Sequence, residues 1–92
     1  MAFEFLPGGV LVQRGLDDLA AGLITDEALV VMIGAPRLRS MGLEVPSPKV
    51  ADPEARLYQS LAAGDADSAH SRYNALIRQL VSFERAFQSG VR

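Results

Sequence analysis

Apolar residues recur at alternating intervals of three and four positions along the last third of the chain. They are Ala66, Ala69, Tyr73, Leu76, Leu80, Phe83 and Phe87, with Ile77 and Val81 beside them. Alternating intervals of this kind keep side chains on one face of an α-helix, and three successive heptads are typical of a helix packed lengthwise against other helices. The pattern predicts a long helix that has Asp65 as its N-cap and ends near Gln88.

A shorter helix is predicted immediately before the long one. Asp52 is a favourable N-cap, Pro53 is tolerated in the first turn, and Gly64 is a favourable end. Leu57, Tyr58 and Leu61 form its apolar face. A connection as short as Gly64-Asp65 requires the two helices to run antiparallel, so residues 53–89 are expected to form a helical hairpin.

Part of this hairpin resembles a tetratricopeptide repeat. In that family a Gly-Asp turn is followed by a helix with an alanine and, four residues later, an aromatic residue. Residues 58–73 repeat this arrangement with Gly64-Asp65, Ala69 and Tyr73, after Tyr58 and Leu61 in the preceding helix. The resemblance implies a helical hairpin with an Ala–Tyr contact. It covers one unit, whereas arrays of such repeats need about three to be stable.

Residues 14–22 predict a short helix, because Leu16, Leu19, Ala20 and Leu23 share one helical face and Gly22 is a favourable C-terminal residue. Residues 26–34 predict a second one. Thr25 is a favourable N-cap and acidic residues fill the first turn. The β-branched residues within 28–33 leave a buried strand as the alternative.

Residues 36–42 predict one or two further helical turns, started by Pro36 and ended by Gly42. Together with residues 26–34 they also suggest a DNA-binding helix-turn-helix. The second helix of that motif would place Ser40 at a core position, and Gly42 would end it too early to lie along a major groove. We therefore interpret this segment as a bend before a proline-rich linker over residues 43–52.

Residues 1–13 are expected to form an N-terminal arm. The arm is either a β-hairpin around Pro7-Gly8-Gly9 or an extended segment docked on the helices. The whole chain then forms one domain, residues 1–92, consisting of the arm, a helical half over 14–42, the linker and the hairpin. The predicted class is all-α: a small bundle of about four helices that ends in the hairpin.

Composition argues against several functions. The chain has no cysteine and one histidine, His70, and it contains no Ser-nucleophile, P-loop or dinucleotide motif, so we expect no enzyme, no cofactor and no small-molecule substrate. Asp65, Asp67 and His70 are too few ligands for a metal site. Since no segment has about 18 consecutive apolar residues, we expect no membrane contact and a cytoplasmic location.

The expected function is that of a helical protein-interaction or assembly module that associates with itself. At 1.5 Å per residue the long helix spans about 35 Å and its partner about 16 Å, so half of the apolar stripe overhangs. Either the first three helices or another chain must cover it. The predicted contact residues are Tyr73, Leu76, Ile77, Leu80, Val81, Phe83 and Phe87 of the stripe, with Phe3 and Phe5 of the arm.

The alternative function is that of a nucleic-acid-associated accessory or regulatory protein. Scattered arginines would then contact the phosphates: Arg37, Arg39, Arg72, Arg78 and Arg85. The net charge of −2 opposes this alternative, because it provides no general attraction to a polyanion.

Overall fold

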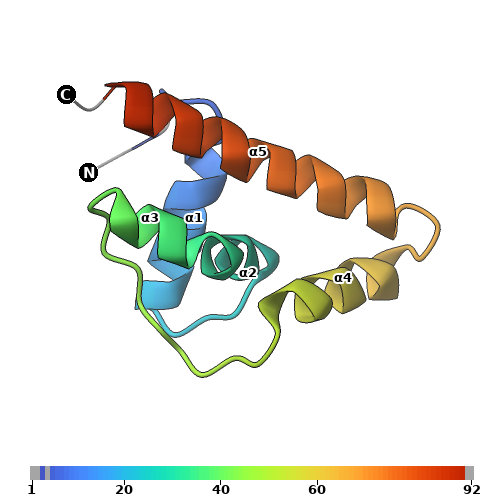
Figure 1. Ribbon diagram of the computed structural model, residues 1–92. Helices are drawn as coiled ribbons and strands as arrows, with labels where there is room; N and C mark the ends of the chain where they lie inside the picture. Colours follow the sequence, from blue (N-terminus) through green and yellow to red (C-terminus); the bar gives the residue numbers. More distant parts are fainter. Residues whose placement is uncertain (1–2, 4, 91–92) are drawn as a thin grey trace.

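The computed structural model describes residue 3 and residues 5–90. These residues contain five α-helices and no strand: α1 (Gly9–Ala20), α2 (Asp26–Ile33), α3 (Ala35–Ser40), α4 (Pro53–Gly64) and α5 (Ala69–Gly90) (Figure 1). The prediction of an all-α chain is confirmed. Among the described residues, no helix combines the length and the apolar character that a membrane span requires.

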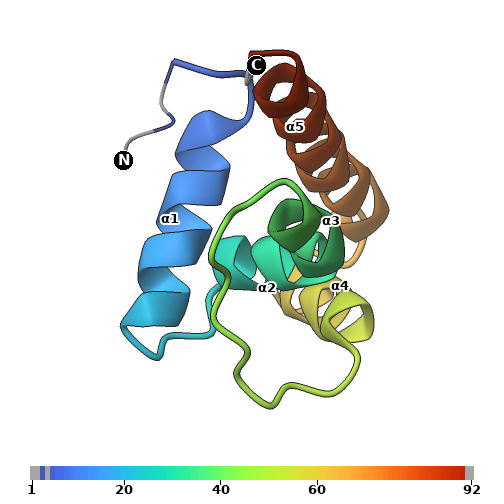
Figure 2. The ribbon, with the colours of Figure 1, turned by 60° about the vertical axis from the view of Figure 1, so that its left-hand side comes forward.

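α2 is the central helix. It packs against each of the other four helices, and α5 lies across the molecule above it (Figures 1 and 2). Four consecutive residues of α2, from Ala28 to Val31, are buried. The Thr25 side chain caps the helix by accepting a hydrogen bond from the Ala28 N–H at 3.2 Å. Residues 28–33 are therefore helical, and the alternative of a buried strand is wrong.

The N-terminal segment differs from the expected arm, because α1 already begins at Gly9. Before it, the chain makes two tight turns, in which Leu6 N–H donates to Phe3 O at 3.0 Å and Gly9 N–H donates to Leu6 O at 2.8 Å. Gly8 has φ 69°, and a Cβ there would lie 2.1 Å from the carbonyl oxygen of Gln79 in α5. The Pro-Gly-Gly sequence thus starts a helix pressed against α5 instead of forming a hairpin turn or an extended arm.

The C-terminal half of α5 is covered by the N-terminal turns. The Phe3 ring makes edge contacts with the Phe83 ring at 5.4 Å and with the Phe87 ring at 5.7 Å between centroids. Gly34, between α2 and α3, packs directly against Leu80 of α5. A Cβ on Gly34 would lie 2.9 Å from the Leu80 methyl groups. Leu80 and Phe83 of the overhanging stripe are therefore packed inside their own chain.

The connection between α4 and α5 is longer than expected. α5 begins at Ala69, and Asp65 is not its N-cap. The Asp65 carboxylate instead accepts a hydrogen bond from the Asp67 N–H at 3.1 Å, within a four-residue turn over 65–68. Beyond this turn Ala69 is fully buried, and the Tyr58 and Tyr73 rings pack at 5.9 Å between centroids.

Residues 41–52 contain no helix or strand and run between α1 and α3, across α2 (Figure 2). Val45 anchors this segment, with 8% of its surface exposed. The Arg39 guanidinium donates to the Val45 carbonyl oxygen at 2.9 and 3.3 Å, and it also contacts the Ser47 hydroxyl. The segment is therefore held in place although it forms no regular structure.

Candidate functional site: the exposed apolar surface

Two residues of the expected contact stripe, Leu80 and Phe83, lie in the interior together with Phe3. Phe83 is fully buried, Leu80 is 4% exposed and Phe3 is 7% exposed, all three covered by this chain alone. These side chains are core residues of the single chain, and they offer no surface to a second molecule. The overhang is thus covered by the first three helices and the turns before them.

The remaining stripe residues are partly exposed: Tyr73, Leu76, Ile77, Val81 and Phe87. Three of them, Tyr73, Leu76 and Phe87, pack against the core. Burial raises the pKa of the Tyr73 hydroxyl, and the carboxylates of Glu54 and Asp52 raise it further. The Tyr73 side chain therefore stays neutral near pH 7, beside the partly exposed Tyr58.

Phe5 differs from every other predicted contact residue, because 95% of its side chain is exposed. Its backbone is nevertheless held on both sides. Phe3 is anchored between two rings of α5, and Gly9 fits so closely against Phe3 that a Cβ on it would lie 1.6 Å from the Phe3 carbonyl oxygen. The fold thus holds an apolar ring in solvent at the N-terminal end of α1.

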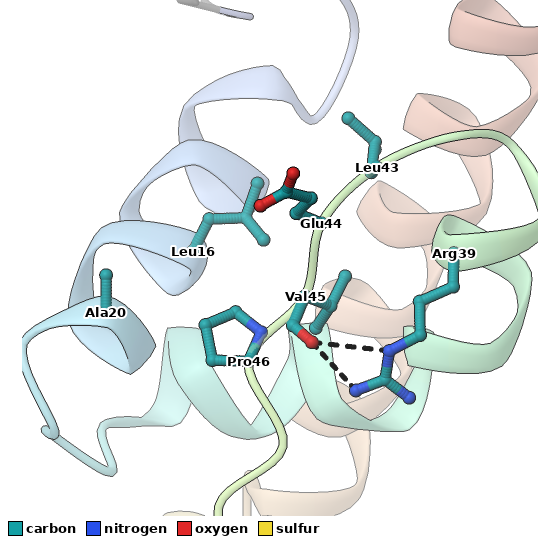
Figure 3. A pocket seen from close by; sticks show the side chains of 7 residues that line it. All are labelled: Leu16, Ala20, Arg39, Leu43, Glu44, Val45 and Pro46. Atoms are coloured by element: carbon teal, nitrogen blue, oxygen red, sulfur yellow. Dashed lines mark hydrogen bonds between the residues drawn. The ribbon is translucent and has the colours of Figure 1, made fainter.

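A surface hollow lies beside the other end of α1. We call it the α1 groove; its volume is about 620 Å³, and it opens between α1 and residues 43–46 (Figure 3). Seven residues line it: Leu16, Ala20, Arg39, Leu43, Glu44, Val45 and Pro46. Five of the seven are apolar. Leu16 and Ala20 lie one turn apart on α1 and face the segment across the groove (Figure 3).

The five arginines of the nucleic-acid alternative do not form one cluster. Arg37 on α3 faces Glu84 on α5, with 3.6 Å between Arg37 Nε and Glu84 Oε1. Arg39 donates a hydrogen bond to the Val45 carbonyl oxygen. The other three, Arg72, Arg78 and Arg85, are exposed along α5. None of these three forms an ion pair with a described residue.

Glu84 was not among the predicted site residues. Its side chain lies next to Phe83 at the edge of the stripe and is 8% exposed as a residue. Burial raises the pKa of this carboxyl group, and the Arg37 guanidinium partly opposes the rise. The sequence holds one local signal of this burial, since Glu84 follows Leu80 by four positions on the same side of the helix.

The described residues contain no group of three or more His, Cys, Asp or Glu side chains that could hold a metal ion. His70 lies 3.1 Å from the Asn74 amide, between ring Nε2 and Nδ2. Comparison with models of protein families, with curated proteins and with solved structures found no match to this chain. Its function must therefore be inferred from the geometry of its surface.

Proposed function

We propose that this chain is a non-catalytic helical interaction module that associates with a second copy of itself. One observation carries the proposal, namely that the fold holds the Phe5 ring 95% exposed on a backbone anchored at Phe3 and Gly9. A phenylalanine in solvent forgoes about 1.5–3 kcal/mol of favourable burial. Because its backbone is already ordered, little conformational entropy is lost when the ring is covered.

Further exposed apolar side chains support the same proposal. Val10 is 48% exposed in the first turn of α1, Leu23 is 53% exposed after its last turn, and Tyr58 is 39% exposed on α4. Exposed leucines and valines are ordinary when isolated. Val10 and Phe5, however, lie within five residues of each other at one end of α1, which makes this end the preferred place for a contact.

Sedimentation equilibrium tests the proposal directly. We expect the weight-average mass to rise from that of one chain to that of two between low micromolar and near-millimolar concentration. The association should persist in 0.5 M salt, because apolar contacts are not screened by ions. A mass that stays at one chain over this whole range would contradict self-association.

A second candidate function, contact with nucleic acid, has one observation in its favour. Among the described residues of α5 the exposed charges are Arg72, Arg78 and Arg85, whereas the acidic residue Glu84 is buried. Titration with duplex DNA tests this candidate. Tight binding that weakens steeply with salt would support it, and the absence of binding at low salt would exclude it.

A further inference from the structure

We propose that Phe5 of each copy inserts into the α1 groove of the other, so that two identical contacts hold a symmetric dimer. The inference rests on the self-association proposed above, and it identifies the two complementary surfaces. Among the described residues Phe5 is 95% exposed, more than any other large apolar residue, and the α1 groove is a surface hollow with a mostly apolar lining.

The groove has the size and the chemistry that an aromatic ring requires. Its volume of about 620 Å³ exceeds what one phenyl ring occupies, so flanking residues can enter with the ring. The apolar part of its lining comes from Leu16, Ala20, Leu43, Val45 and Pro46. A phenyl ring placed against these side chains gains burial, which must exceed the cost of covering part of the Glu44 side chain that also lines the groove.

Residues 43–46, which form one side of the groove, are held in position by hydrogen bonds within the single chain. Leu43 N–H donates to Leu38 O at 3.1 Å, and Arg39 holds the Val45 carbonyl oxygen at 2.9 Å. Because the Arg39 guanidinium donates to this carbonyl oxygen, it holds residues 43–46 in position beside α1 (Figure 3). A preformed groove lowers the entropic cost of binding.

Phe5 cannot reach the groove of its own chain. The turns from Phe3 to Gly9 hold Phe5 at the N-terminal end of α1, whereas Leu16 and Ala20 lie in its C-terminal half. From Gly9 to Leu16 the helix rises by about 10 Å, and Ala20 lies about 6 Å farther. Only a second chain can therefore bring a Phe5 ring to this groove.

The positions of the two surfaces along α1 indicate a two-fold arrangement. Phe5 precedes one end of the helix and the groove flanks the other, so an antiparallel pair of α1 helices brings each Phe5 to the opposite groove. Such an isologous contact uses the same patch on both copies and closes at two chains.

The test uses two variants whose changed positions are exposed in the single chain. Phe5→Ser removes the ring, and Ala20→Lys places a charged side chain at the groove while suiting the C-terminal end of a helix. Each variant alone loses both contacts of the dimer. We expect each to raise the Kd of self-association, measured by sedimentation equilibrium, by about 100-fold or more.

Mixing the two variants gives the sharper result. A mixed dimer retains one contact, in which the intact Phe5 of the Ala20→Lys chain enters the intact groove of the Phe5→Ser chain. The mixture should therefore associate about tenfold or more tightly than either variant alone. Leu23→Ser serves as the control, since Leu23 is 53% exposed and outside the groove, and it should keep the wild-type Kd.

The outcomes separate the two proposals. A wild-type dimer whose Kd is unchanged by Phe5→Ser and Ala20→Lys would overturn the groove contact and leave self-association standing. A mixture no tighter than the separate variants would also overturn it. A wild-type chain that remains a monomer throughout would overturn both proposals.

Discussion

Glu84 shows how a single residue can carry the pH dependence of this fold. It is the one charged side chain that is buried among the described residues, and its nearest counter-charge is the largely exposed guanidinium of Arg37. The 3.6 Å between Arg37 Nε and Glu84 Oε1 is too long for a strong charge-assisted hydrogen bond. Desolvation therefore outweighs the ion pair, and the pKa of Glu84 is raised.

We predict that Glu84 makes the chain less stable as pH rises. Because the pKa of Glu84 is higher in the folded than in the unfolded chain, the folded chain binds the proton more tightly. The stabilisation by Glu84 is complete at a pH below the pKa that Glu84 has in the unfolded chain. It is lost as pH rises through the pKa of Glu84 in the folded chain. Urea denaturation of the wild type and of Glu84→Gln, each at pH 4 and at pH 7, measures this effect.

The Glu84→Gln variant should lose this component of the pH dependence, because glutamine does not titrate. Arg37→Ala is the companion variant. Without the guanidinium the pKa of Glu84 should rise further, which extends the pH dependence to higher pH. Identical pH profiles for the wild type and Glu84→Gln would show that Glu84 contributes no proton linkage.

At the scale of the elements, α1 and α2 approach each other closely at Gly15. Gly15 lies where the two helices meet, and a Cβ there would lie 2.3 Å from Val31 Cγ2 and 2.5 Å from the Glu27 carbonyl oxygen. The second of these contacts is with backbone, which cannot rotate away. Gly15 thus allows α1 to pack directly on the central helix.

We predict opposite effects for two Gly→Ala substitutions in helices. Gly15→Ala should lower the free energy of unfolding by about 1–3 kcal/mol, because the added methyl group overpacks the α1–α2 contact. Gly64→Ala, at the end of α4, meets no atom within 4 Å and should be neutral or raise stability by up to about 1 kcal/mol. Chemical denaturation of both variants decides this, and equal stabilisation by both would rule out the close contact.

Several elements were predictable because their signals are local. Thr25 and Asp52 each accept a hydrogen bond from the N–H three residues on, as their positions in the sequence suggested. The start of α1 was missed because Pro7-Gly8-Gly9 equally suits a hairpin turn. The start of α5 was missed because the Asp65 carboxylate turns to Asp67 within the loop. In both places a contact or turn outside the helix competes with the capping signal.

At the scale of the whole molecule, the proposed self-association would couple to stability. A dimer that forms only from folded chains stabilises the folded state by mass action. We therefore predict that the Tm of the wild type rises with protein concentration. For Phe5→Ser the Tm should be independent of concentration and equal to that of the dilute wild type, because the Phe5 ring contributes almost nothing to the core.

Differential scanning calorimetry over a range of concentrations measures this coupling. Phe87→Ser is a useful contrast, since the Phe87 ring packs against Phe3 and Phe83 within the chain. That substitution should lower the Tm equally at every concentration. A Tm for Phe5→Ser below that of the dilute wild type would instead place the Phe5 ring in the core.

The sequence by itself determined that the chain is helical and where α3 and α4 lie, and it favoured a helix at α2. Caps, prolines and apolar intervals act over a few residues, so they are visible without the fold. Only the tertiary structure decided how the apolar stripe of α5 is covered. Phe3 and Phe83 meet across eighty positions of sequence, and Phe5, two residues from Phe3, is left in solvent. Intervals along one helix show which face is apolar, whereas the packing of distant segments decides whether that face is interior or surface.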